Sequence, residues 1–167
     1  MARPNVFDEQ FQYDPEDPAG YRSGQIRIGD AAGGAELTVR LFQIPAGESL
    51  CPYHYEYVEE WLVVLHGELQ LRGPDGTSTV SGGEVVCFPA GPSGAHKLTN
   101  EAADSARILM FSSAAEPSVA VYPDSDKVGV WAGDDRDEFI FRRADGSVDY
   151  YDGEAPEGPA QPGMQEN

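Results

Sequence analysis

Several features that would assign this chain to a common functional class are absent or scarce. No apolar run approaches the roughly 20 residues that a membrane-spanning helix needs, and the N-terminus has no apolar stretch typical of a signal peptide. We therefore expect a cytoplasmic protein with no membrane partner. The only two cysteines, Cys51 and Cys87, are too few for a disulfide framework and are expected to be reduced. Lys and Arg number 11 against 29 Asp and Glu, so nucleic acid is not an expected partner.

Turn-forming residues are plentiful, with 19 Gly and 13 Pro among 167 residues. They separate short apolar runs every 8–12 residues or so, which favours an all-β sandwich or barrel. We find no convincing helix between Gln25 and Met110. The strands expected there are Gln25–Ile28, Ala35–Ile44, Cys51–Tyr55, Glu60–His66, Glu68–Arg72, Thr77–Val80, Val85–Pro89, His96–Thr99 and Arg107–Ser112.

The pattern divides the chain into an N-terminal arm (1–24), a β-barrel (25–113), a C-terminal extension (114–155) and a disordered tail (156–167). The tail has almost nothing to bury. An acidic run over 134–138 is predicted to be a solvated loop. The β-like segments of the extension are Val119–Tyr122, Val128–Trp131, Glu138–Arg143 and Val148–Tyr151.

Two of the three histidines lie in segments suited to metal binding. In a strand, residues two apart share a face, so His54 and Glu56 are expected to project to one side. A short hairpin then returns Glu60 beside them, and His96 opens a strand after a Pro/Gly-rich turn. Imidazole and carboxylate groups that converge inside a barrel are suited to a divalent first-row metal. The alternative is that these are polar side chains on a solvated sheet face.

Together these segments resemble the two motifs of the cupin superfamily. The first motif is Gly, His-x-His, Glu and Gly, and the second is Gly, Pro-x-Gly, His and Asn. The matching residues here are Gly47, His54, Glu60 and Gly67, then Gly83, Pro89, Gly91, His96 and Asn100. The gap between Gly91 and His96 exceeds the usual one by two residues. The resemblance implies a cupin-type antiparallel β-barrel (a double-stranded β-helix, or jelly roll) with a metal bound by His54, Glu60 and His96.

The chain departs from the family where the second His of the first motif is replaced by Glu56. Glu56 can be a fourth ligand to Fe, Mn, Ni or Zn. It can instead remain outside the metal's ligands and act as a catalytic base beside His54, Glu60 and His96. A third interpretation is that the replacement abolishes metal binding and leaves a small-molecule cavity.

The resemblance implies a metal-dependent enzyme acting on a small organic molecule, with a dioxygenase-like oxidoreductase as the first hypothesis. An isomerase or lyase and a non-catalytic binding protein are the alternatives, and a homodimer is expected. Cavity-lining candidates in phase with the ligands are Leu62, Val64, Leu98 and Asn100, which favours an apolar or aromatic ligand. Cys51, three residues before His54, is expected to face the opposite side.

Overall fold

A six-stranded antiparallel sheet forms one wall of a β-barrel. The computed structural model describes residues 2–7, 10–114, 116–133, 138–146, 148–150 and 152. In hydrogen-bonded order the strands of this sheet are β1 (Gln12–Tyr13), β2 (Gly24–Ile26), β3 (Leu37–Ile44), β10 (Ala106–Ser113), β5 (Glu60–His66) and β8 (Val85–Phe88). The expected N-terminal arm therefore contributes a short outer strand, β1, to the barrel wall.

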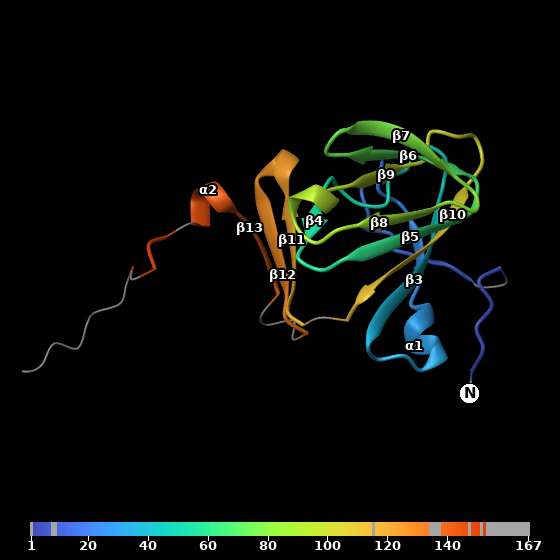
Figure 1. The fold of residues 1–167 in the computed structure, drawn as a ribbon, viewed down its shortest axis with the longest axis horizontal. Helices are drawn as coiled ribbons and strands as arrows, with labels where there is room; N and C mark the ends of the chain where they lie inside the picture. Colours follow the sequence, from blue (N-terminus) through green and yellow to red (C-terminus); the bar gives the residue numbers. More distant parts are fainter. Residues whose placement is uncertain are drawn as a thin grey trace, which may run out of the picture.

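A three-stranded sheet closes over the first one, as Figure 1 shows. Its order is β7 (Gly76–Ser81), β6 (Glu68–Gly73) and β9 (Lys97–Thr99). Alternating residues of both sheets point into the space between them, as Leu62 and Val64 do from β5. The buried cluster comprises Ile44, Leu62, Val64, Leu69, Val80, Phe88, Leu98, Ala106, Ile108 and Met110. The expectation of an all-β antiparallel barrel is confirmed.

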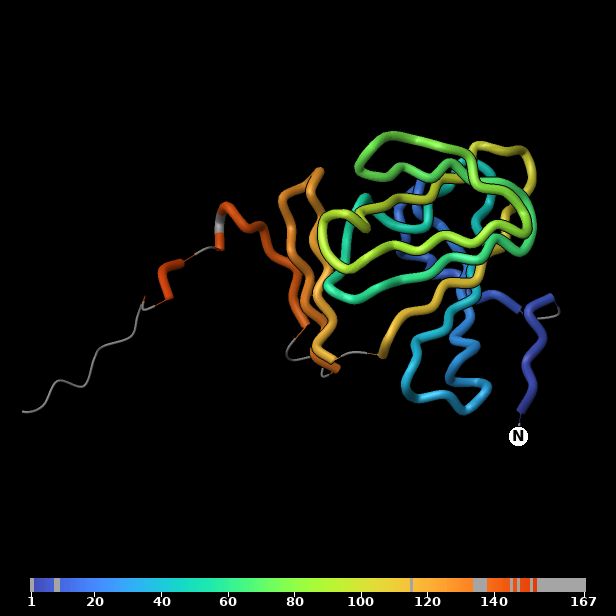
Figure 2. Tube along the Cα trace, in the orientation of Figure 1, coloured from blue at the N-terminus to red at the C-terminus, as the bar shows by residue number. Residues whose placement is uncertain are grey.

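A third sheet is built mainly from the C-terminal extension. Its strands, in order, are β13 (Phe139–Arg142), β12 (Lys127–Trp131), β11 (Ser118–Tyr122) and β4 (Tyr55–Glu56). Because β11 pairs with β4, the extension is joined directly to the segment between His54 and Glu60. Figures 1 and 2 show this sheet at one end of the barrel, on the side away from the N-terminus.

The structure corrects the expectation that the barrel region has no helix. Helix α1 spans Ile28–Ala32 and is followed by Gly33, whose left-handed backbone (φ 86°) caps it. Ile28 is buried, and α1 packs against β3. Five residues are too few to produce a helical periodicity in the sequence. Short helical turns also occur at η1 (Pro92–Gly94), η2 (Pro123–Ser125) and α2 (Arg143–Gly146). None of the helices in the described part of the chain is long and apolar enough to cross a membrane.

Two expected strands are wrong in whole or in part. Residues 51–53 form bends, and pairing in this segment is limited to a bridge at His54 and the two residues of β4. Val148 and Tyr150 do not belong to a strand. These residues are 70% and 87% exposed, so little of their surface is packed against the rest of the protein as a stable strand requires. Residues 134–137 of the acidic run and the tail 156–167 lie outside the described residues. The boundaries of the arm, barrel, extension and tail stay predictions.

Candidate metal centre

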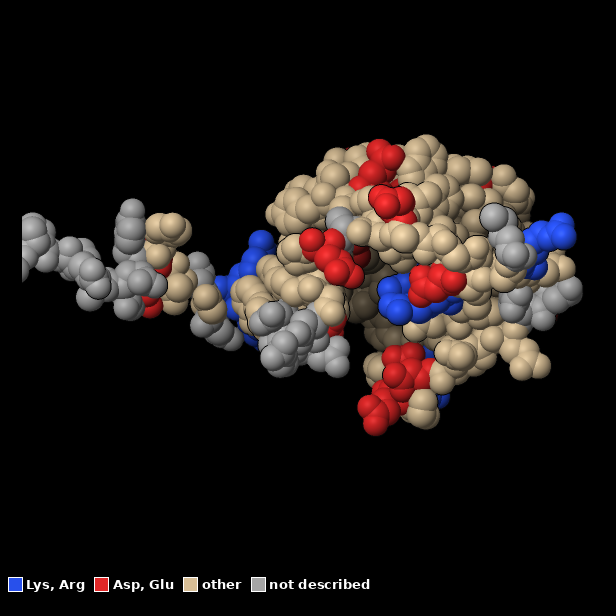
Figure 3. All heavy atoms as spheres, turned by 90° about the horizontal axis from the view of Figure 1, so that it is seen from below, with Lys and Arg blue, Asp and Glu red and all other residues tan. Residues whose placement is uncertain are grey.

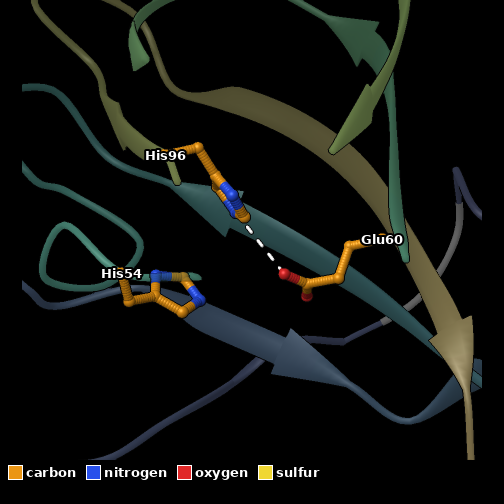
Figure 4. Close-up of side chains that lie close together, drawn as sticks. All are labelled: His54, Glu60 and His96. Atoms are coloured by element: carbon orange, nitrogen blue, oxygen red, sulfur yellow. Dashed lines mark ion pairs between the residues drawn. The ribbon is translucent and has the colours of Figure 1, made fainter. Parts of the chain in front are cut away.

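Three side chains from separate parts of the barrel converge at one point. One ligand atom from each of His54, Glu60 and His96 lies within 4.8 Å of the other two, and Figure 4 shows the three side chains pointing toward one another. Glu60 opens β5, while His54 and His96 face each other across a β-bridge. In that bridge each backbone N–H donates to the other residue's carbonyl, at 3.1 and 2.8 Å. Backbone pairing therefore places the two imidazoles side by side.

The Pro/Gly-rich turn before His96 depends on its glycines. At Gly94, a Cβ atom would lie 1.8 Å from the carbonyl oxygen of Pro89, so no larger residue fits without a backbone shift. Gly91 has a φ of +85° and donates its N–H to the carbonyl of Glu56 at 2.7 Å. The turn thus connects the segment that carries His96 to the strand that carries Glu56.

Each histidine has one ring nitrogen held by a backbone carbonyl. Nδ1 of His54 lies 3.0 Å from the oxygen of Pro52, and Nδ1 of His96 lies 2.9 Å from that of Gly94. A carbonyl oxygen only accepts hydrogen bonds, so Nδ1 of each ring carries the proton. Nε2 of each ring therefore keeps its lone pair, which is the form in which histidine binds metals.

The Nε2 atom of His96 is buried and has no hydrogen-bond partner. It lies 3.9 Å from Oε2 of Glu60, the contact that is dashed in Figure 4. Burial and the neighbouring His54 lower the pKa of His96 to about 4, so the ring is neutral at pH 7 and this contact is not an ion pair. A buried lone pair without a donor fits a metal ion.

Glu60 is also in an unfavourable environment for a carboxylate. Burial, together with the nearby Glu56, raises the pKa of Glu60 to about 8, although Arg40 opposes this shift. A divalent cation would favour the ionised carboxylate and satisfy both Nε2 lone pairs. The donor set of two imidazoles and one carboxylate therefore fits a divalent first-row metal.

Glu56 lies outside this group of three. It belongs to β4, where it pairs with Ala120 of β11, and its Oε2 accepts a hydrogen bond from the Ser118 hydroxyl at 3.5 Å. Burial raises the pKa of Glu56 above its ordinary value. Its side chain lines the same cavity as His54, Glu60 and His96. In the described residues, Glu56 is therefore a neighbour of the three-residue cluster rather than a member of it.

A cavity of about 860 Å³ opens beside the three side chains. Figure 3 shows the surface hollowed on this side of the molecule, with acidic and basic side chains near the hollow. The expected lining residues are wrong: Leu62, Val64 and Leu98 are buried in the core. The cavity is lined instead by many polar residues together with other apolar ones, among them Phe42, Met110 and Trp131. Asn100 is also buried, because its side-chain amide donates to the carbonyls of Ile44 and Asp104.

Cys51 also differs from expectation. Its Sγ lies 3.4 Å from Nδ1 of His54, because residues 51–53 form bends rather than the regular strand that would turn it away. Burial, with smaller effects from Glu60 and Glu56, raises the pKa of Cys51 to about 12. The thiol is thus protonated at neutral pH and is not a thiolate ligand.

Sequence reasoning missed three polar residues that line the cavity, namely Arg40, Ser118 and Tyr122. Arg40 is the only charged residue in the strand Leu37–Ile44, and a charge within an otherwise apolar strand was a usable signal. Ser118 and Tyr122 come from β11. Nothing local in the sequence indicates that β11 pairs beside the histidines.

Comparisons with known proteins find similarity across the barrel. Residues 40–112 match the family model described as Cupin domain. A putative sugar phosphate isomerase from Acidithiobacillus ferrooxidans is 22% identical with a TM-score of 0.74, over 86% of this chain and 91% of that one. A sugar phosphate isomerase of the cupin superfamily from Silicibacter pomeroyi is 23% identical with a TM-score of 0.75, over 90% and 98%.

A more distant similarity is to a polyketide cyclase from Streptomyces resistomycificus. It is 23% identical with a TM-score of 0.58, over 71% of this chain and 83% of that one. No curated protein matches the chain. At these sequence identities the similarity shows a shared fold. It does not assign the activity of any of these proteins to this chain.

Proposed function

The chain contains a cupin domain, and from this premise we propose that it is a metal-dependent enzyme acting on a small organic molecule. His54, Glu60 and His96 would hold the metal, which is one of Fe, Mn, Ni or Zn. The observation that supports this most directly is the buried Nε2 of His96, which has no partner and lies beside an acid with a pKa near 8. A bound divalent metal would act as a Lewis acid that polarises a substrate oxygen.

The reaction that the site supports best is proton transfer, as in an isomerase or lyase, with Glu56 as the general base. A base works best when its pKa lies near the working pH, and burial shifts the pKa of Glu56 in that direction. The Ser118 hydroxyl donates to the Glu56 carboxylate and orients it. Glu56 would take a proton from one carbon of the substrate and return it to a neighbouring atom, so no external oxidant is needed.

The names of similar structures agree with this choice. Two proteins of similar fold are named sugar phosphate isomerases, and isomerisation is a proton-transfer reaction that one base can serve. Glu56 stands in the cavity without belonging to the His54, Glu60 and His96 cluster, which leaves its carboxylate available to a substrate. Glu56 as a fourth metal ligand is the competing assignment.

A dioxygenase is the second candidate, because two histidines and one carboxylate form the donor set of non-haem iron oxygenases. Oxygen uptake by the iron-loaded protein, measured with candidate substrates, would favour this activity over isomerisation. A non-catalytic binding protein is the third, and it predicts ligand binding without turnover in either assay.

The first experiment is the metal content of tag-free protein, measured by mass spectrometry before and after reconstitution. We expect near-stoichiometric metal in the parent chain and none in the Glu60→Ala, His96→Ala double variant. His66→Ala is the matched control, because His66 is exposed and lies outside the cluster. No metal in the reconstituted parent would overturn the proposed function.

We also propose that the protein forms a homodimer, as expected from the sequence. The short outer strand β1 of the six-stranded sheet, contributed by the N-terminal arm, supports this proposal. Light scattering at micromolar concentration tests it, and a monomer would contradict it. A cytoplasmic location stays a prediction.

A further inference from the structure

Arg40 lies on the inner face of β3, close to the proposed metal ligands. Cross-strand pairing aligns Thr38 with Ser112, and Ser112 with Glu60. Arg40 is two residues from Thr38 and aligns with Met110, so it lies on the same face in the next row of the sheet. Arg40, Met110 and Glu60 all line the 860 Å³ cavity.

Arg40 is half-buried, and one nitrogen of its guanidinium is buried without a partner. Its Nε atom is inaccessible to solvent and makes no hydrogen bond. In the part of the chain that the structure describes, Arg40 forms no ion pair, whereas Arg72 pairs with Asp124 at 2.6 Å and Arg143 with Asp126 at 2.9 Å. Burial lowers the pKa of Arg40, and the charges of Glu56 and Glu60 only partly oppose this. A partly desolvated cation without a partner is unfavourable, and an anion bound beside it in the cavity would remove this cost.

A count of charges around the proposed metal agrees with this. When a divalent metal displaces the proton of Glu60, Arg40 contributes one positive charge, Glu56 and Glu60 contribute two negative charges, and the histidines are neutral. The metal-loaded inner cluster then carries a net charge of +1, which one anionic group would neutralise. The other charged residues that line the cavity are the exposed Asp14, Arg27, Glu116 and Glu138 and the half-buried Asp17. Water screens the charges of the exposed ones.

We propose that Arg40 is a substrate-binding residue that pairs with an oxyanion, a carboxylate or a phosphate, of the small molecule that enters the cavity. A guanidinium suits this role because its planar donors match the two oxygens of such a group. The inference rests on the proposed function, since the metal supplies the positive charge that the bound anion would balance. The ligand that we infer is an organic acid or a phosphate ester, in place of the apolar or aromatic ligand expected from the sequence.

The test compares three ligands with the same carbon skeleton: glycerol, glycerate and glycerol 3-phosphate. Isothermal titration calorimetry on the full, metal-loaded chain measures the Kd of each. We expect the parent to bind glycerate or glycerol 3-phosphate at least tenfold more tightly than glycerol, and the preferred anion identifies carboxylate or phosphate. Arg40→Met should remove this preference, and Arg40→Lys should restore part of it.

Arg72→Met is the matched control, because Arg72 does not line the cavity and already pairs with Asp124 at 2.6 Å. This variant should keep the parent's Kd values. Metal content and the unfolding midpoint are measured for every variant, so that loss of metal or of folding is recognised separately.

Equal binding of the three ligands by the parent would overturn the inference. Unchanged anion binding by metal-loaded Arg40→Met would overturn it too. If the parent holds no metal, the proposed function fails instead, and the same comparison on the metal-free chain then decides whether Arg40 binds the anion.

Discussion

The inner space of the barrel has two regions that contrast sharply although the same strands line both. In the apolar region, Leu62, Val64 and Ile108 are fully buried or nearly so and pack only for stability. In the polar region, His54 and His96 are buried and Glu60 is half-buried, and Nε2 of His96 has no hydrogen-bond partner. β5 contributes Glu60 to one region and Leu62, two residues later, to the other. The contrast predicts that stability is concentrated in one region and the proposed chemistry in the other, so that each can be altered separately.

The largest expected effect is on the apolar region. Leu62→Ala should lower the free energy of unfolding by about 2–5 kcal/mol, because it removes buried methyl groups and leaves a cavity. Urea unfolding measures this loss. The folded fraction of the variant should still bind metal with the parent's stoichiometry, and loss of metal from folded variant protein would contradict the separation of the two regions.

Glu60→Gln should have the opposite effect on the metal-free protein. The pKa of Glu60 is about 8 in the folded chain, above the ordinary value for Glu of about 4.3. The folded parent therefore retains a proton that the unfolded chain has lost, so its stability falls as the pH rises from about 4.5 to about 8 and is constant above that. The variant lacks this fall and should be more stable than the parent at pH 9 by on the order of 2 kcal/mol.

Denaturant unfolding at pH 5 and pH 9 checks this prediction. The same variant should bind metal far more weakly, because an amide oxygen is a poorer ligand than a carboxylate. Equal pH dependence of stability in the parent and the variant would mean that Glu60 does not titrate in this range.

The turn before His96 should matter to the polar region alone. Gly94→Ala places a Cβ against the Pro89 carbonyl and should displace the Gly94 carbonyl that holds Nδ1 of His96. We expect metal affinity to fall by about 10–100-fold, as when an outer hydrogen-bond partner of a ligand is lost. Gly82→Ala is the control, since its Cβ would meet nothing nearer than 3.8 Å. Similar metal affinities in both variants would contradict this role of the turn.

Metal affinity should fall as the pH is lowered. Because the metal binds the ionised carboxylate, it must displace the proton that Glu60 carries below about pH 8. We expect the apparent affinity to fall by about tenfold for each pH unit between 8 and 6. Competition with a chelator of known pH dependence measures it, and a flat profile would show that Glu60 is not a ligand.

The smallest effect is expected at Cys51. Its thiol touches Nδ1 of His54, but the proton on Nδ1 is already held by the Pro52 carbonyl. Cys51→Ser should therefore change metal affinity by less than about threefold, within the range of one weak hydrogen bond. A larger loss would indicate that the thiol positions His54.

The success of sequence reasoning differed between strands and the segments that join them. β5 begins and ends where the pattern predicted, at Glu60 and His66, because the alternation of apolar residues is a local signal. Residues 51–53 were expected to continue a strand and instead form bends. Their conformation depends on the bridge from His54 to His96, a partner 42 residues away in the chain.

The sequence by itself determined where most barrel strands lie along the chain and the candidates His54, Glu60 and His96, since both follow from short-range spacing of residue types. Only the tertiary structure decided that a ring nitrogen of each histidine lies within 4.8 Å of a Glu60 oxygen, that Glu56 lies outside the cluster, and that Arg40 lines the same cavity. The physical reason is that side-chain direction depends on the register between strands that are distant in sequence. Whether a charge is buried or paired depends on which of those strands meet.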